Sequence, residues 1–203
     1  MNRPEKSNQS PLWRDGWYQF ASSLVSPNFG PRSPQVEVDL IVLHCISLPP
    51  GEYGGNAVQK LFNNQLDCNQ HPYFKSLQGL QVSSHFYIRR QGELLQFVSA
   101  DDRAWHAGVS SYLGRSNCND NSIGIELEGV EGGHFEASQY ETLVSLCAAI
   151  LQGYGVTAIA GHEHIAPGRK HDPGVGFDWR LLQQSLGLAS KHFPTSVRSA
   201  IVS

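Results

Sequence analysis

The chain has 203 residues, of which 40% are hydrophobic and 16% charged, a balance that predicts one globular domain with a full core. Its formal net charge of -3 excludes a strongly basic surface, so we expect neither nucleic acid nor a membrane as a partner. No run of about 18 apolar residues predicts a membrane-spanning helix. The four cysteines form no C-x-x-C pair, which excludes a four-cysteine zinc site.

Both ends of the chain are expected to be flexible, around a domain that covers residues 12–188. Residues 1–11 are polar and contain no apolar segment of the kind that a secretory signal needs. A cytoplasmic, reduced protein is therefore the economical interpretation. Residues 189–203 are interpreted as a loose tail. The sequence leaves the oligomeric state open, with a monomer as the expectation.

Apolar runs and alternating patterns predict five strands. The alternation is strictest in S-I-G-I-E-L-E, where three apolar side chains share one face and Gly124, Glu126 and Glu128 share the other. A turn at Gln91-Gly92 joins two of the strands as a β-hairpin. The predicted strands are residues 36–44, 82–89, 93–98, 122–128 and 156–160.

Helical spacing of apolar residues predicts the other regular elements. The clearest pattern lies at 136–154, where Gly153 and Gly155 mark the end, and the last helix is capped near Asp178. The predicted helices are 56–66, 136–154 and 177–186, and residues 12–25 form a short helix or a loop on the core. Strands separated by helices, with one hairpin, predict an α/β fold: a single domain with a central mixed β-sheet flanked by helices.

Long irregular stretches connect these elements. The proline-rich residues 26–35 predict an extended connection, and residues 67–79 a loop with aromatic side chains. Residues 101–121 form the longest predicted loop and contain Trp105. Loops of that length in compact domains are usually functional or disordered, and the aromatic content argues against disorder.

One polar segment dominates the candidate chemistry. Residues 161–174 read G-H-E-H-I-A-P-G-R-K-H-D-P-G and directly follow the last predicted strand. A packed core does not accommodate this mixture of histidines, acids and bases, whereas metal-assisted chemistry uses it. Pro167 and Pro173 exclude a regular helix or inner strand, so we expect an irregular loop at a strand end, where sites are usually placed. Any one of its histidines, taken alone, is better explained as a satisfied or solvated side chain than as a ligand.

Two strand ends predict where a metal ion can bind. His44 ends one inner strand and His162 leaves another, so neighbouring strands would bring both imidazoles to one edge of the sheet. Asp172 follows ten residues after His162 and adds a carboxylate. Two histidines, one carboxylate and an open fourth position are a catalytic Zn²⁺ set. The alternative for His44 is a strand-end histidine bonded to the backbone, and spacing alone leaves both open.

Two further side chains are candidates for catalysis. Glu126 is a carboxylate on an otherwise apolar strand, where burial requires a charge partner, a metal-bound water or a raised pKa. Gly124 beside it leaves room for another group to approach. The alternative is that this face is simply wet, which is the preferred interpretation for Glu128. Lys170 precedes Asp172 by two residues, so an extended loop points both side chains the same way, unless Lys170 is only a solvated lysine.

Five strings in the chain together resemble one enzyme family. They are V-L-H-C-I-S-L-P-P-G-E-Y-G-G from Val42, H-P-Y-F from His71, A-W-H-A-G-V-S-S-Y from Ala104, C-N-D-N-S-I-G-I-E-L-E-G from Cys118, and the polar segment from Gly161. These strings resemble the AmpD-type N-acetylmuramoyl-L-alanine amidases, which act on 1,6-anhydro-muropeptides in peptidoglycan recycling. The resemblance spans residues 13–179, nearly the whole chain.

The resemblance implies a fold shared with peptidoglycan-recognition proteins and a role for each candidate residue. The implied zinc ligands are His44, His162 and Asp172, the catalytic glutamate is Glu126, the lysine that stabilises the transition state is Lys170, and the substrate groove is lined by Trp105 and Arg169. Three positions depart from the family pattern: Cys45 replaces an asparagine, His171 a small polar residue, and His164 a residue other than histidine. These departures leave the ligands intact and concern the substrate contacts.

The implied reaction is zinc-dependent hydrolysis of the amide bond that joins the lactyl group of the muramoyl sugar to L-alanine. Glu126 would take the proton of the attacking water and pass it to the leaving amine, while zinc and Lys170 stabilise the oxyanion. Two other functions remain as alternatives: a peptidoglycan-binding receptor without catalysis, and an exported amidase of intact peptidoglycan. The complete set of candidate residues argues against the receptor, and the missing signal sequence argues against export.

Overall fold

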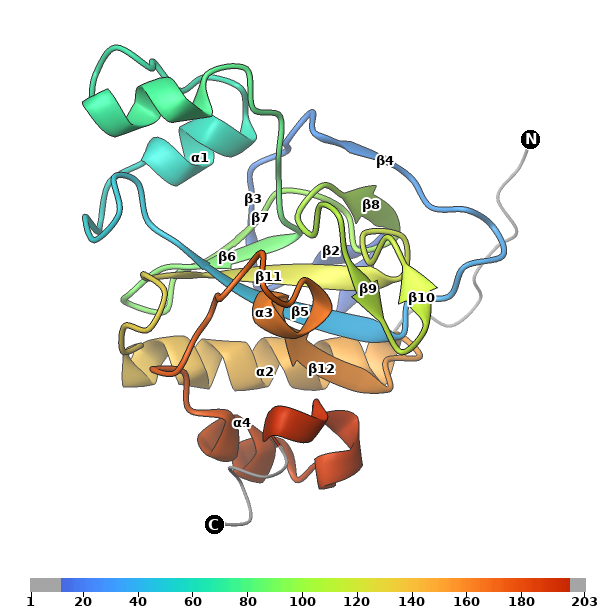
Figure 1. Cartoon of the computed structure of the whole chain (residues 1–203). Coiled ribbons are helices and arrows are strands. Elements are labelled where there is room, and N and C mark those ends of the chain that lie inside the picture. The colour runs from blue at the N-terminus through green and yellow to red at the C-terminus, as the bar shows by residue number, and fades with distance from the viewer. Residues whose placement is uncertain (1–11, 198–203) are drawn as a thin grey trace.

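A six-stranded mixed sheet forms the middle of the molecule, which is described here by a computed structural model for residues 12–197 (Figure 1). Its strands in spatial order are β12 (Ala158–Gly161), β5 (Leu40–Ile46), β11 (Ser122–Glu128), β6 (Phe86–Ile88), β7 (Leu94–Gln96) and β3 (Ser22–Ser23). Neighbouring strands are parallel except for the β6–β7 hairpin, which is antiparallel. The predicted mixed α/β sheet is therefore confirmed.

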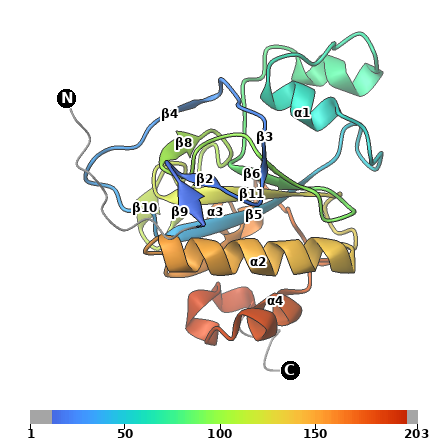
Figure 2. The same cartoon turned by 180° about the vertical axis from the view of Figure 1, so that it is seen from behind.

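Helices cover both faces of this sheet. On one face lies the long helix α2 (Ala137–Gly153), with α4 (Trp179–Leu186) packed beyond it (Figure 2). The helix α1 (Ala57–Phe62) and the 3-10 helix η1 (Pro72–Leu77) share an apolar cluster with β6 and β7. None of the helices in the described part of the chain has the length and apolar character that a bilayer crossing requires.

The alternating strand β11 explains why the two faces of the sheet differ. Its apolar residues Ile123, Ile125 and Leu127 are fully buried in the main core cluster, together with Leu143 and Leu146 of α2. Burial of each such side chain contributes about 1.5–3 kcal/mol relative to exposure, so the alternation fixes which face packs on α2. The glycine and the two glutamates of the strand consequently face the other side.

Residues 12–25, expected as a short helix or a loop on the core, contain three short strands instead. They form the hairpin of β1 (Trp13–Arg14) and β2 (Trp17–Tyr18), and then strand β3. Asp15 and Gly16 take positive φ angles of 51° and 74°, as the tight turn of a two-residue hairpin requires. The indole of Trp13 and the ring of Tyr18 then lie 5.0 Å apart and enter the core. Cross-strand packing of these large rings therefore places the segment on the core.

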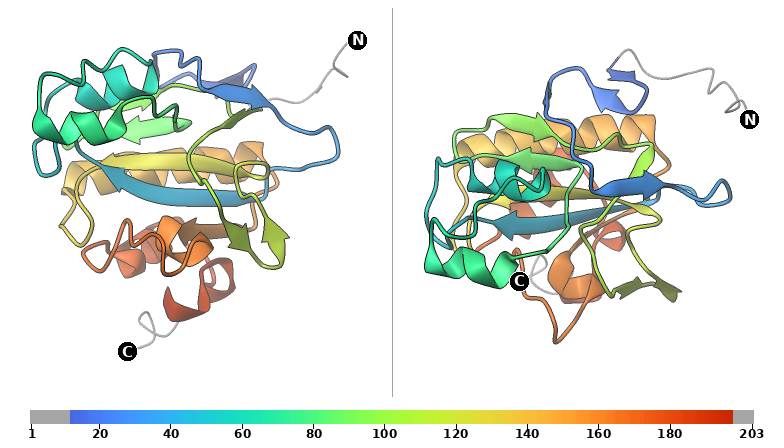
Figure 3. Two further views of the ribbon diagram at one scale, coloured as in Figure 1. Left: turned by 45° about the horizontal axis from the view of Figure 1, so that its top comes forward. Right: turned by 90° about the horizontal axis from the view of Figure 1, so that it is seen from above.

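Two short strand pairs organise parts of the chain predicted as connections. Strand β4 (Phe29–Pro31) pairs with β8 (Asp102–Ala104), and β9 (Ser111–Tyr112) pairs with β10 (Arg115–Ser116). The long loop predicted at 101–121 is thus irregular only between these strands. Its central part, the β9–β10 pair, lies beside the start of β5, where Arg115 forms an ion pair with Asp39 (Figure 3).

The C-terminal part of the chain is ordered further than the sequence indicated. The Oδ1 atom of Asp178 accepts the hydrogen bond of the Leu181 amide at 2.8 Å, so the predicted cap of α4 is confirmed. The 3-10 helix η2 (Ser190–His192) follows, and Phe193 and Val197 are buried in the main core. The predicted tail from 189 therefore packs on the domain as far as residue 197. Residues 1–11 and 198–203, where flexibility is expected, lie outside the described residues.

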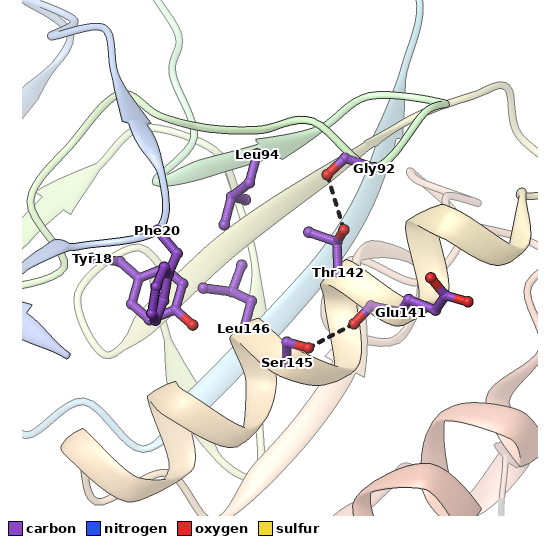
Figure 4. Close-up of a pocket in the computed structure, with 8 residues that line it drawn as sticks. All are labelled: Tyr18, Phe20, Gly92, Leu94, Glu141, Thr142, Ser145 and Leu146. Atoms are coloured by element: carbon purple, nitrogen blue, oxygen red, sulfur yellow. Dashed lines mark hydrogen bonds between the residues drawn. The ribbon is translucent and has the colours of Figure 1, made fainter.

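A hollow of about 470 Å³ lies between β2, β7 and α2 (Figure 4). Leu94 of β7 and Leu146 of α2 point into it, and the ring of Phe20 lies at its side, 67% exposed. None of its lining residues belongs to the predicted site.

Candidate active site

Sheet register brings three of the predicted residues to one edge. In the parallel pair of β5 and β11, His44 lies opposite Glu126, so both side chains project from the same face. In the pair of β5 and β12, Gly161 lies opposite Leu43, and His162 follows at the level of His44. Strands β5 and β12 are therefore neighbours, which is the condition under which both imidazoles were expected at one edge of the sheet. His162 begins a single helical turn, α3 (His162–Ile165), so the polar segment is irregular only after that turn.

Three ligand atoms converge at this edge. The Nδ1 atoms of His44 and His162 lie 2.9 Å apart, and Asp172 Oδ2 lies 3.3 Å from the first and 3.2 Å from the second. His44 is 1% exposed and His162 is 4% exposed. Among the described residues this is a group of histidines and acids close enough to share one metal ion.

The donor set fits zinc. Zinc binds nitrogen and oxygen at about 2.0–2.2 Å in tetrahedral geometry, which separates the ligand atoms by roughly 3.3–3.6 Å. The three measured separations lie near or slightly below that range. His162 Nε2 lies 3.1 Å from the carbonyl oxygen of Ala107, which can only accept, so this nitrogen carries the hydrogen and Nδ1 keeps a lone pair. A cation between the three atoms therefore removes the repulsion between their lone pairs.

The electrostatics of the group favour a metal over protons. Burial lowers the pKa of His44 to about 4, with the charges of His162 and Lys170 acting in the same direction. Burial alone would raise the pKa of Asp172, but the close approach of His162 and His44 lowers it overall, so this carboxyl stays ionised. A neutral imidazole and an ionised carboxylate are the forms that bind a metal ion.

Glu126 lies beside the group and has no hydrogen-bond partner for its Oε2 atom among the described residues. The residue is 9% exposed. Burial raises the pKa of Glu126 well above its usual value, the charge of Asp172 adds to the effect, and Lys170 opposes it. A buried carboxylate with a free oxygen and a raised pKa has the properties of a general base.

A cavity of about 590 Å³ opens above these residues. All seven predicted site residues line it, and they come from four different parts of the chain. They are His44, Trp105, Glu126, His162, Arg169, Lys170 and Asp172. Tyr73 of η1 and Leu80 also line it, so the lining combines polar and apolar groups. Such a lining suits a ligand with both polar and apolar groups.

Arg169 is held by the loop that follows β8. Its Nη2 atom donates to the carbonyl oxygen of Ala107 at 2.9 Å and to that of Val109 at 2.6 Å. The Ala107 carbonyl also accepts from His162, so Arg169 shares an acceptor with a candidate ligand. The guanidinium thereby fastens this loop at the side of the metal-binding group.

Glu128 and His164 lie in surroundings that the sequence did not reveal. The carboxylate of Glu128, expected on a wet surface, is 3% exposed and accepts hydrogen bonds from the amides of Gly54 at 2.7 Å and Arg90 at 2.9 Å. The ring of His164 turns towards Trp179, 5.4 Å between centroids, and its Nδ1 accepts from the amide of Gly161. His164 is therefore a packing residue, whereas Cys45 and His171 line the cavity.

The sequence interpretation gave no role to His106, which contacts a candidate ligand. Its Nδ1 atom lies 2.9 Å from His44 Nε2. A signal for it existed in the alternating strand, because a Cβ atom on Gly124 would lie 2.6 Å from the ring of His106. The glycine that left room beside Glu126 in fact makes room for this imidazole.

Comparison with known proteins identifies the family. The model of the N-acetylmuramoyl-L-alanine amidase family matches residues 34–175, which include every predicted site residue. The chain belongs to this family. The amidase is 48% identical over 170 residues to the 1,6-anhydro-N-acetylmuramyl-L-alanine amidase AmpD of Citrobacter freundii, covering 83% of this chain and 91% of that one.

Solved structures agree with the fold of the amidase. A selenomethionine derivative of AmpD superposes with a TM-score of 0.84 at 45% identity, covering 86% of this chain and 99% of that chain. The Escherichia coli amidase AmiD in complex with the substrate anhydro-N-acetylmuramic acid-L-Ala-D-gamma-Glu-L-Lys has a TM-score of 0.54 at 28% identity, with 76% and 60% coverage. The Drosophila peptidoglycan recognition protein SA, at 14% identity and a TM-score of 0.55 with 86% and 95% coverage, shares the fold alone. The predicted relation to the peptidoglycan-recognition fold is thus confirmed.

Proposed function

We propose that the protein is a zinc-dependent amidase that hydrolyses the bond between the lactyl group and L-alanine in 1,6-anhydro-N-acetylmuramoyl peptides. The observation that carries the proposal is the convergence of two imidazole nitrogens and one carboxylate oxygen beside a buried glutamate, whose Oε2 atom has no hydrogen-bond partner among the described residues. The name of the Citrobacter freundii relative and the substrate in the AmiD complex support the anhydro-muropeptide as the substrate class. The activity belongs to peptidoglycan recycling in the cytoplasm.

In this proposal His44, His162 and Asp172 hold the zinc ion. Bound there, zinc supplies a Lewis acid that lowers the pKa of a water molecule and polarises the substrate carbonyl. The protein chain leaves the fourth side of the group open to the cavity, where water and the scissile amide can enter. Burial of both imidazoles excludes competing bulk water from the other sides.

Glu126 and Lys170 carry the proton and charge transfers. The Oε2 atom of Glu126 takes a proton from the attacking water as the new C–O bond forms. The same carboxyl then gives that proton to the amine as the C–N bond breaks, so one group serves as base and acid. Lys170 lies over the same cavity and stabilises the negative charge on the carbonyl oxygen in the transition state. The products are the 1,6-anhydro sugar acid and the free stem peptide.

Trp105 and Arg169 are proposed to line the substrate groove. Both border the cavity, one from the loop after β8 and one from the loop after α3. The indole offers an apolar face to the sugar ring. The guanidinium holds the 107–109 backbone in place beside it.

Metal analysis combined with mass spectrometry of digests tests the proposal. The purified protein should contain about one zinc per chain and should release stem peptide from anhydro-muropeptide, and removal of the metal should abolish the release. His44→Ala is expected to lose both the metal and the activity. Zinc binding without any cleavage would instead favour a peptidoglycan-binding receptor. Faster cleavage of whole sacculi than of anhydro-muropeptide would favour an amidase of intact peptidoglycan.

A further inference from the structure

A row of hydrogen bonds runs from the metal-binding group back into the sheet. His44 Nε2 lies 2.9 Å from His106 Nδ1, and His106 Nε2 lies 3.2 Å from the hydroxyl oxygen of Ser122. That hydroxyl lies 2.5 Å from the carbonyl oxygen of Cys118. The rings of His44 and His106 meet edge to face, with 5.0 Å between their centroids. The row therefore links a candidate ligand to a backbone carbonyl in the turn before β11.

The donors in this row can be assigned from its far end. The Cys118 carbonyl can only accept, so the single hydroxyl hydrogen of Ser122 points to it. The Ser122 oxygen then has to accept from His106, which puts the ring hydrogen on His106 Nε2. A neutral imidazole carries one such hydrogen, so His106 Nδ1 is an acceptor. His44 Nε2 consequently donates to it, and His44 Nδ1 is left with a lone pair.

The ring of His106 can occupy this position because of a glycine in the strand beneath it. A Cβ atom on Gly124 would lie 2.6 Å from both Cγ and Nδ1 of the ring, closer than real Cβ contacts allow. The backbone amide of His106 is held separately, by the side-chain oxygen of Asn119 at 3.0 Å. The strand and the loop thus fix the ring from two sides.

From this geometry we propose that His106 is a positioning residue, which sets the tautomer and orientation of His44 so that the Nδ1 lone pair faces His162 and Asp172. Gly124 contributes by leaving space for the His106 ring, and Ser122 contributes by accepting the hydrogen bond that fixes the His106 tautomer. Groups that hydrogen-bond to a metal-binding histidine in this way typically change metal affinity by roughly 10- to 100-fold. The inference rests on the proposed metal site and adds residues to it.

Two variants at one position separate hydrogen bonding from simple packing. His106→Leu fills much of the space but offers no acceptor, whereas His106→Asn places an amide oxygen near the position of Nδ1. We expect His106→Leu to bind Zn²⁺ roughly 10- to 100-fold more weakly than the wild type in competition with a chelator, and His106→Asn to recover most of the affinity. His71→Leu, which removes a histidine outside the cavity, should leave the affinity unchanged. Equal affinities for His106→Leu and the wild type would overturn the proposal, as would equal losses in both His106 variants.

Nuclear magnetic resonance of the ring nitrogens provides a readout that does not depend on zinc. In the metal-free protein the His106 ring should carry its hydrogen on Nε2 and the His44 ring on Nε2, and Ser122→Ala should produce a second His106 tautomer. Gly124→Ala should displace the ring and weaken Zn²⁺ binding as His106→Leu does. A His106 hydrogen on Nδ1 in the wild type would overturn the proposal even if every variant failed to fold. A wild type with the assigned tautomers but no affinity for Zn²⁺ would contradict the proposed function instead.

Discussion

Glu126 and Glu128 lie two residues apart on β11, project from the same face and are both buried, yet their surroundings are opposite. Glu128 accepts hydrogen bonds from the amides of Gly54 and Arg90, and Arg89 Nε lies 3.9 Å from it. The Oε2 atom of Glu126 has no such partner among the described residues, and its pKa is raised. One carboxylate fastens the loop after β5 to the sheet, and the other is left with an unused oxygen beside the metal-binding group.

The comparison shows that burial alone does not distinguish a functional carboxylate from a structural one. Donors stabilise the ionised form of a buried carboxyl and make it a structural anchor. Without donors, the same burial destabilises the ionised form, which raises the pKa of the carboxyl and makes it a candidate for proton transfer. Substitutions of Glu126 should therefore reduce the catalytic rate, whereas substitutions of Glu128 should reduce the stability of the fold.

The largest difference is expected in turnover. Glu126→Gln should reduce the release of stem peptide from anhydro-muropeptide by about 10²- to 10⁴-fold, because the amide cannot accept the proton of the attacking water. Its zinc content should remain that of the wild type. Glu128→Gln should keep its rate within a few-fold at a temperature where it stays folded. A Glu126→Gln variant with near-wild-type rate and full zinc content would contradict the assigned role.

Replacing the cation near Glu126 should likewise reduce the catalytic rate far more than replacing the cation near Glu128. Lys170→Met is expected to lower the catalytic rate by about 10²- to 10³-fold, because it removes one stabilising charge from the transition state. Arg89→Met, which removes the cation near Glu128, should change the rate little. The comparison requires rates of both variants at saturating substrate, with zinc content as the control. Similar rates in the two variants would place the oxyanion away from Lys170.

The stability of the fold should depend more on Glu128 than on Glu126. Glu128→Gln is expected to lower the free energy of unfolding by about 1–3 kcal/mol, because its amide group presents hydrogens to backbone donors that need an acceptor. Denaturant unfolding of the metal-free protein at neutral pH measures this effect. Gln59 offers a control, because its buried Oε1 has no hydrogen-bond partner in the described part of the chain, so Gln59→Met should cost less. A Glu128→Gln variant as stable as the wild type would show that Gly54 and Arg90 find other acceptors.

The smallest effect is a pH-dependent gain in stability for Glu126→Gln without metal. A carboxyl whose pKa is raised in the folded state destabilises the fold as pH rises above its ordinary value near 4.5, because the unfolded chain ionises first. A tenfold difference in acidity between the folded and unfolded carboxyl corresponds to about 1.4 kcal/mol. Thermal unfolding should therefore show no gain below about pH 4 and a gain on the order of 1 kcal/mol near neutral pH. A gain that did not vary with pH would indicate a packing effect.

The sequence predicted the site better than it predicted the outer parts of the fold. His44 and His162 were identified because each lies at or next to the end of an apolar strand, and neighbouring strands can bring such ends together. Glu126 was identified as a carboxylate on an otherwise apolar alternating strand. Residues 12–25 were expected as a short helix or a loop, and the hairpin was missed because a helix and a hairpin with a turn at Asp15-Gly16 suit the same spacing of large rings. Periodicity over so few residues does not separate the two.

Contacts between distant segments could not be predicted in the same way. His106 and His44 are 62 residues apart in the sequence. The residues around His106 do not indicate which of its ring nitrogens contacts a ligand. Glu128 was placed on a wet surface because the loop that covers it, around Gly54, has no regular pattern of its own. Both assignments depend on where a loop lies, which is decided by packing and not by local preference.

The sequence by itself determined the chemistry of this protein: which imidazoles and carboxylates are available, on which strands, and in a family pattern that the comparisons bear out. Only the tertiary structure decided which of two neighbouring glutamates keeps a free oxygen and which histidine stands behind a ligand. The physical reason is that a side chain's role depends on the donors and acceptors around it. Segments far apart in the chain supply those groups, and the fold brings them together.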